Sequence, residues 1–189
     1  MNSHPKIFIA GSRTLPRLNQ DIKQRISNIV DQGFTVIVGD AIGADKAVQQ
    51  YLEERQYRDV LIFCTEGQCR NNIADWPIQA ISAANPKRKD FEYYRSKDLA
   101  MAEAADYGLM LWDRQSRGTL ANIVALVKRL KPVVVYNASS KSFCTLRTAD
   151  DLINMVSHHN PAAINAVKSE VGHGAECTIA PTEELIPLF

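Results

Sequence analysis

Three glycine-containing segments carry the side chains that could do chemistry. They read Gly11-Ser12-Arg13-Thr14, Gly39-Asp40-Ala41-Ile42-Gly43-Ala44-Asp45 and Asp113-Arg114-Gln115-Ser116-Arg117-Gly118-Thr119. Glycine lets a ligand or another backbone approach closely, and arginine and hydroxyl side chains donate the hydrogen bonds that a phosphate accepts. The segments therefore indicate a binding site for a phosphate-bearing ligand.

The third segment is the most concentrated of the three, because it leads directly into a helical pattern over residues 120–130. The N-terminus of a helix attracts anions through its unpaired N–H groups and its dipole. We therefore favour ligand binding over a solvated turn here. The residues expected to line this part of the site are Asp113, Ser116, Arg117, Gly118 and Thr119.

The other two segments each admit two interpretations. Gly11, Ser12 and Arg13 fit a phosphate site or an ordinary turn with a surface arginine. In the second segment, Gly39 and Gly43 belong to a turn before a helix, and Asp40 or Asp45 could cap that helix or bind a ribose hydroxyl, the cap being the commoner use. The glycine spacing does not match the dinucleotide-binding fingerprint.

The elements that position these segments alternate regularly. Short, continuously apolar runs predict buried strands over residues 6–10, 34–38, 60–64, 107–112 and 133–136, and helical patterns cover residues 18–30, 44–55, 91–105 and 120–130. Alternating strands and helices predict an α/β, Rossmann-like, doubly wound parallel sheet of at least five strands, in the order 3-2-1-4-5. The loops after the first and fourth strands would then diverge and leave a crevice for ligand.

The helix over residues 91–105 contributes Lys97 and Asp98, which form either a surface pair or part of the same crevice. The connection over residues 65–90 is unusually long and includes the basic run Lys87-Arg88-Lys89, so it is functional or holds additional structure. We assign residues 1–159 to one Rossmann-like domain and residues 160–189 to a C-terminal extension packed on it.

Composition narrows the range of partners. A formal charge of +1 gives no global field for nucleic acid and argues against that partner. The four cysteines are irregularly spaced, as expected for reduced thiols in the cytoplasm. No second set of metal ligands at a suitable spacing accompanies Cys64 and Cys69, and the same is true of the histidines His158, His159 and His173. No apolar run reaches the length of a membrane span or signal-peptide core. We expect a soluble, cytoplasmic protein without a metal, other cofactor or membrane partner.

Taken together, Gly11-Ser12-Arg13, the segment from Gly39 to Asp45, and Arg117-Gly118-Thr119 resemble the SLOG superfamily. This Rossmann-like group includes LOG-type phosphoribohydrolases and DNA-processing protein A. The run Cys69-Arg70-Asn71-Asn72 and Trp76 are most similar to its YspA/YpsA-related branch, and the resemblance covers roughly residues 6–136.

This resemblance implies a nucleotide-type small molecule as ligand and, since such proteins commonly assemble, a homo-oligomer. LOG-type enzymes cleave the N-glycosidic bond of nucleoside monophosphates with an arginine and a glutamate, whose positions here hold Lys97 and Asn122. A neutral amide cannot replace a carboxylate by charge, so we predict binding or sensing of a nucleotide-derived ligand, with catalytic residues unassigned. The alternative is an N-glycosidic hydrolase or transferase. Similarity to DNA-processing protein A adds single-stranded DNA binding as a distant alternative.

Overall fold

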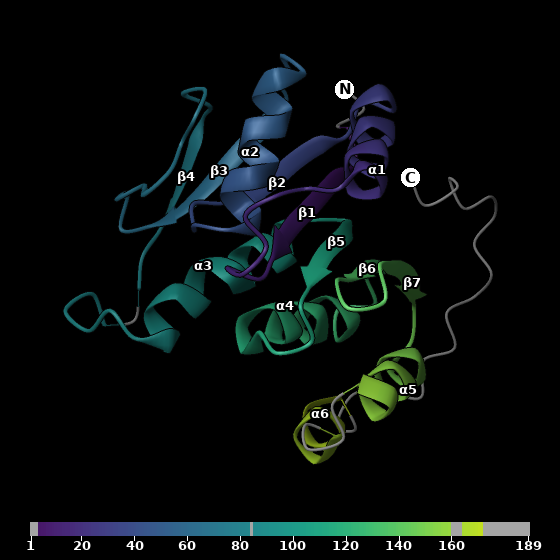
Figure 1. The fold of residues 1–189 in the computed structure, drawn as a ribbon. Helices are drawn as coiled ribbons and strands as arrows, with labels where there is room; N and C mark the ends of the chain where they lie inside the picture. The colour runs from purple at the N-terminus through teal and green to yellow at the C-terminus, as the bar shows by residue number, and fades with distance from the viewer. Residues whose placement is uncertain (1–3, 84, 160–163, 172–189) are drawn as a thin grey trace.

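The computed structural model describes residues 4–83, 85–159 and 164–171 (Figure 1). The elements follow in the order β1 (Lys6–Gly11), α1 (Gln20–Asp31), β2 (Thr35–Gly39), α2 (Ala44–Glu54), β3 (Val60–Thr65), β4 (Ile78–Ile81), α3 (Phe91–Ala104), β5 (Tyr107–Trp112), α4 (Arg117–Val127), β6 (Val133–Asn137), β7 (Ser142–Leu146), α5 (Ala149–His159) and α6 (Ile164–Val171).

The strands form one sheet in the order β4-β3-β2-β1-β5-β6-β7. Its five central strands are parallel and follow the predicted order 3-2-1-4-5, so the predicted Rossmann-like α/β fold is confirmed. The prediction omitted the two edge strands. β4 extends the parallel sheet and lies within the long connection over residues 65–90, whereas β7 pairs antiparallel with β6. Both are largely exposed, so neither has the continuous apolar run of a buried strand.

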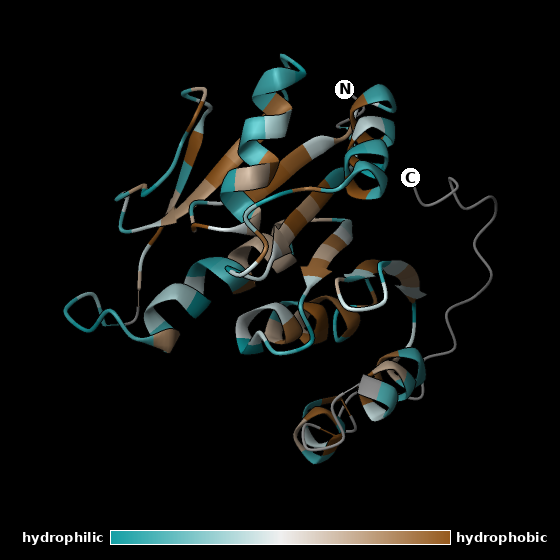
Figure 2. Cartoon of the chain, viewed as in Figure 1, coloured by the Kyte–Doolittle hydropathy of each residue, from teal (hydrophilic) through white to brown (hydrophobic). Residues whose placement is uncertain are grey.

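The sheet is covered by helices on both faces, which explains why its central strands carry continuous apolar runs. In β1, Ile7 and Ile9 pack in a cluster with residues of α1 and α2, whereas Phe8 and Ala10 pack in a second cluster with residues of α3 and α4. Successive side chains of a strand point to opposite faces. Figure 2 shows the result as hydrophobic strands between helices that are hydrophilic on their outer sides.

The C-terminal part is described only in pieces. Val167 and Val171 of α6 join the cluster that contains α3 and α4, so α6 packs on this face of the domain. The rest of the predicted extension, residues 160–163 and 172–189, lies outside the described residues, and so does His173. Among the helices that are described, none combines the length and the apolar character needed to cross a bilayer.

Candidate functional site

The carboxyl ends of the parallel strands open into a cleft of about 640 Å³. Most residues predicted for the site lie in its lining, namely Gly11, Arg13, Asp45, Lys97, Asp113, Ser116, Arg117, Gly118, Thr119 and Asn122. Four others, Ser12, Gly39, Asp40 and Gly43, lie outside the lining and are buried around it. The predicted crevice between the loops after β1 and β5 is therefore present as a cavity.

Ser12 holds the loops of the cleft together. Its carbonyl oxygen accepts a hydrogen bond from the N–H of Ala44 at the start of α2, at 3.3 Å. Its hydroxyl accepts from the N–H of Asp113, at 3.1 Å, and lies 3.4 Å from the hydroxyl of Thr119 in α4. The N-termini of α2 and α4 thus meet at one buried residue. Ser12 acts here as a structural link and has no surface in the cleft.

Asp113 also stabilises this loop. Its carboxylate accepts hydrogen bonds from the N–H groups of Gln115 and Ser116, at 2.9 and 2.7 Å, and from the hydroxyl of Thr14, at 2.6 Å. Partial burial opposes ionisation, but these hydrogen bonds lower the pKa of Asp113 below its ordinary value. Its acceptor capacity is therefore largely used by the protein, and the carboxylate stays charged.

The first turn of α4 remains open for an anion. Ser116 caps the helix by accepting from the N–H of Thr119, whereas the N–H groups of Arg117 and Gly118 precede the first intrahelical hydrogen bond, which runs from Leu120 to Ser116. Apart from its own helical turn and chain neighbours, a methyl group added at Gly118 would have no atom of the described residues within 4 Å. Free space, helix-terminal N–H groups and a positive dipole end therefore coincide here.

Asn122 lies one turn further along α4 and faces the same cleft. It is only 6% exposed, and within the described part of the chain its Oδ1 atom has no hydrogen-bond partner. Leaving a buried polar atom unpaired costs about 1 to 3 kcal/mol. A ligand hydroxyl or amino group in the cleft would remove this cost.

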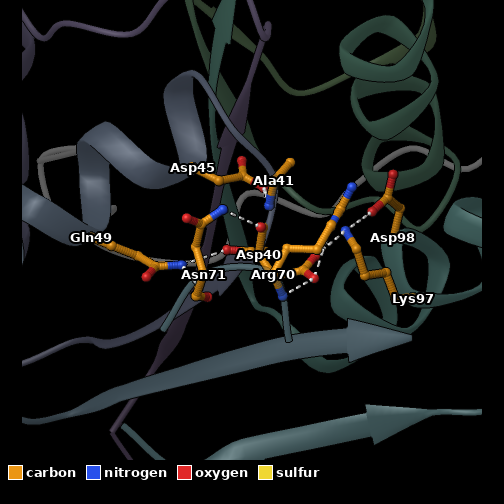
Figure 3. A network of polar contacts seen from close by, with 9 residues as sticks. Asp40, Ala41, Asp45, Gln49, Arg70, Asn71, Lys97 and Asp98 are labelled. Atoms are coloured by element: carbon orange, nitrogen blue, oxygen red, sulfur yellow. Dashed lines mark hydrogen bonds and ion pairs between the residues drawn. The ribbon is translucent and has the colours of Figure 1, made fainter. Parts of the chain in front are cut away.

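A largely buried polar cluster joins the end of β2, α2, the 65–90 connection and α3 (Figure 3). Asp40, only 2% exposed, binds the guanidinium of Arg70 with both carboxylate oxygens, at 3.0 and 2.7 Å, and also accepts from the backbone N–H of Arg70. Burial opposes ionisation, but the hydrogen bonds from Arg70 and the charge of Lys97 lower the pKa of Asp40. Asp40, whose carbonyl oxygen also accepts from the side-chain amide of Asn71, thus anchors Arg70 and Asn71 to the end of β2.

Lys97 is the central cation of this cluster. Its ammonium group lies 2.7 Å from a carboxylate oxygen of Asp98 and 3.9 Å from one of Asp40, and its side chain is 5% exposed. Burial disfavours the charge, but the carboxylates of Asp98, Asp45 and Asp40 raise the pKa of Lys97 above its ordinary value. The surface-pair interpretation of Lys97 and Asp98 was therefore wrong.

Gly39 makes room for this cluster. A methyl group added there would lie 2.5 Å from a carboxylate oxygen of Asp45 and 3.1 Å from the ammonium nitrogen of Lys97. The two groups therefore pack directly over the backbone at the end of β2. Gly39 serves the packing of charged side chains and does not itself line the cleft.

Asp45 is the carboxylate of the cluster that faces the cleft. One of its oxygens accepts from the N–H of Ala41, at 3.2 Å, and no other hydrogen bond to it occurs among the described residues. Burial raises the pKa of Asp45 to about 6, against an ordinary value of 3.8. A buried, weakly paired carboxylate lowers stability, and such groups are typical of binding and catalytic sites.

The stability of the protein should accordingly depend on pH through Asp45. The pKa of Asp45 is higher in the folded state than in the unfolded state, so the folded protein holds this proton more tightly. The free energy of unfolding therefore falls as the pH rises from about 4 to about 6. Asp45→Asn has no such proton to lose. The unfolding free energy of the variant relative to the parent should rise by about 2 kcal/mol between pH 4 and pH 7, because each pKa unit is worth about 1.4 kcal/mol and part of the shift is already expressed below pH 4.

Urea denaturation of both proteins at several pH values measures this difference. Asp75→Asn, at an exposed position outside the cleft, is the matched control and should show no such trend. A parent-to-variant difference that stays constant from pH 4 to pH 7 would show that the Asp45 carboxylate is solvated in the folded protein.

The cleft also contains residues that were not predicted for the site, including Arg70, Lys89 and Phe91, and it contains Asp98, for which the crevice was one of two interpretations. Arg70 and Lys89 lie in the long connection, and no sequence pattern indicated that this connection folds back to the cleft. Asp90, which caps α3 by accepting from the N–H of Tyr93, marks the start of that helix and was a usable local signal. Among the described residues, no group of three or more potential metal ligands is present.

Comparison with known proteins supports the fold assignment. No protein-family model matches this chain, and no curated protein matches it. Among solved structures, the chain is similar to DNA processing protein A from Helicobacter pylori, which was described for its single-stranded DNA binding mode. The TM-score is 0.54 and the sequence identity 15%, over 90% of this chain and 82% of that chain. The two proteins share a fold.

Proposed function

We propose that the cleft binds a nucleotide or nucleotide-derived small molecule, with its phosphate at the N-terminus of α4. The observation that carries this proposal is the unpaired Oδ1 atom of Asn122, which faces the cleft one turn from the open N–H groups of Arg117 and Gly118. A phosphate would accept from those N–H groups, and a ligand hydroxyl or amino group would donate to Asn122.

Two arginines supply positive charge for the same phosphate. Arg13 and Arg117 line the cleft, and neither forms an ion pair within the described part of the chain. Arg70 and Lys97, by contrast, are already paired with Asp40 and Asp98. Arginine binds phosphate through parallel, charge-assisted hydrogen bonds. The proposal therefore assigns phosphate binding to Arg13 and Arg117 and a structural role to Arg70 and Lys97.

Replacing these arginines should weaken binding of adenosine monophosphate. Arg117→Ala or Arg13→Ala is expected to reduce the affinity by about 1 to 3 kcal/mol, because each removes a charge-assisted contact. Titration calorimetry measures the change. Arg58→Ala is the matched control, since this exposed arginine precedes β3 at the opposite end of the sheet and should bind as the parent does. Unchanged affinity in both cleft variants would show that the phosphate does not bind at this position.

The N-glycosidic hydrolase or transferase remains an alternative for the same cleft, because Asp45 offers a carboxylate although Asn122 does not. An assay for base release distinguishes the enzyme from the binding protein. Nucleoside monophosphates incubated with the protein are analysed by chromatography for free base. Release of base that is abolished by Asp45→Asn would favour the enzyme, and saturable binding without release would favour the binding function.

Single-stranded DNA is the second candidate ligand, favoured by the shared fold with DNA processing protein A. The basic run Lys87-Arg88-Lys89 precedes Asp90, the residue that caps α3, and its last residue lines the cleft. A formal charge of +1 counts against this ligand. An oligothymidylate that displaces adenosine monophosphate, with an affinity that falls steeply with salt, would favour DNA over the free nucleotide.

A further inference from the structure

An aromatic side chain is exposed in the cleft. Phe91, the first residue of α3, belongs to the cleft lining and keeps 51% of its surface exposed. A large apolar side chain in contact with water is unfavourable, and its position in a concave cleft means that a ligand could cover it. The other large exposed apolar side chains of the described chain, Ile42, Ile73, Ile78 and Leu130, are not in the lining.

A second ring lies on the same side of α3. Tyr94 follows Phe91 by three residues, which places both on one face of the helix, and it also lines the cleft. The guanidinium of Arg70 lies 4.5 Å from the centre of the Tyr94 ring, and Arg70 is itself held by Asp40. Tyr93 contacts the ring edge-to-face, at 5.0 Å. These contacts hold the Tyr94 ring in a defined orientation.

The cleft therefore has two chemically different ends. The N-terminus of α4 is polar and open to an anion, and the N-terminal turns of α3 present the two rings. The volume of about 640 Å³ exceeds what a phosphate group alone would fill. A planar aromatic group that is joined to a phosphate through a sugar matches both ends, since aromatic side chains bind nucleobases by stacking.

We propose that Phe91 and Tyr94 form a stacking subsite for a nucleobase, so that the ligand is a base-containing nucleotide and not a sugar phosphate. This inference rests on the proposed function, because it takes the phosphate to lie at α4. Phe91 provides the exposed stacking surface. Tyr94, held by Arg70, orients the base against the wall of the cleft.

The experiment compares three probes by titration calorimetry: adenosine monophosphate, ribose 5-phosphate and inorganic phosphate. The parent should bind adenosine monophosphate at least ten times more tightly than ribose 5-phosphate. Phe91→Ala should weaken adenosine monophosphate binding by about 5- to 150-fold and leave ribose 5-phosphate unchanged, because only the base stacks. Phe91→Tyr should restore most of the loss. Ile78→Ala, which removes an equally exposed side chain on β4, is the matched control and should bind as the parent does.

The outcomes separate the two proposals. Equal affinities of the parent for adenosine monophosphate and ribose 5-phosphate, or an equal loss of both in Phe91→Ala, would overturn the stacking subsite and leave the phosphate site in place. If none of the three probes binds to the parent, the proposed function fails and the subsite fails with it. Since Phe91 is exposed, the variant should keep the melting temperature of the parent, and this is checked before titration.

Discussion

Lys97→Met is expected to lower the free energy of unfolding by about 3 to 5 kcal/mol, the range found when one partner of a buried ion pair is removed. Methionine nearly matches lysine in length but lacks the charge. The substitution would leave Asp98 and Asp45 without their nearby cation, while Asp40 would keep Arg70. Buried carboxylates without compensation are strongly unfavourable.

Urea denaturation at pH 7 and pH 5 tests this expectation. The loss should be smaller at pH 5, because Asp45, whose pKa is already about 6, then takes up a proton and removes one negative charge from the cluster. Lys46→Met, at an exposed position of α2, makes the same chemical change outside the cluster and should be nearly neutral. A loss below about 1 kcal/mol at pH 7 would mean that the pair behaves like a surface salt bridge.

Gly43→Ala is expected to lower the free energy of unfolding by about 3 kcal/mol, the sum of an unfavourable left-handed backbone and a steric clash. Gly43 immediately precedes α2 and has a φ of 82°. A methyl group added there would overlap the backbone of Arg13, with the carbonyl oxygen nearest and Cα at 2.5 Å. A backbone cannot move aside as a flexible side chain can, so the loop that carries Arg13 would be displaced, and nucleotide affinity should fall as well.

Gly118→Ala is the matched control for this substitution. Gly118 lies in the first turn of α4, where an added methyl group would meet no atom within 4 Å, and alanine favours a helix over glycine by about 1 kcal/mol. The control should therefore be as stable as the parent or more stable. It should still weaken nucleotide binding, because the methyl group occupies the proposed phosphate space. Equal stability losses in Gly43→Ala and Gly118→Ala would contradict the role given to Gly43.

The strands and their order could be predicted because their signals are local. A strand buried on both faces shows a continuous apolar run, such as residues 7–10 in β1 and 133–136 in β6, and right-handed crossovers then restrict the possible orders. The start of α4 also has a local signal, since Ser116 is a favoured capping residue. The edge strands β4 and β7 were not predicted, because exposed strands lack a continuous apolar run.

The different roles of the two aspartates in the second glycine segment could not be predicted from the sequence. Asp40 and Asp45 looked alike as candidates for capping or ribose binding, and each is buried. The structure pairs Asp40 with Arg70, thirty residues away in a connection whose path no local pattern indicated, and places Asp45 in the cleft. Neither carboxylate caps α2, whose N-cap residue Gly43 has no side-chain hydrogen bond.

The α/β class, the order of the five central strands and the convergence of the loops after β1 and β5 follow from the amino-acid sequence, because hydrophobic period and capping depend on neighbouring residues and strand twist makes crossovers right-handed. Which groups pair and which face the cleft becomes visible only in the folded chain. Folding buries Lys97 against the partly exposed Asp98, a pair that sequence alone left open to the surface, and it leaves Phe91 exposed in the cleft. The physical reason is that burial, and with it the strength of each charge and the exposure of each ring, is set by segments distant in the chain.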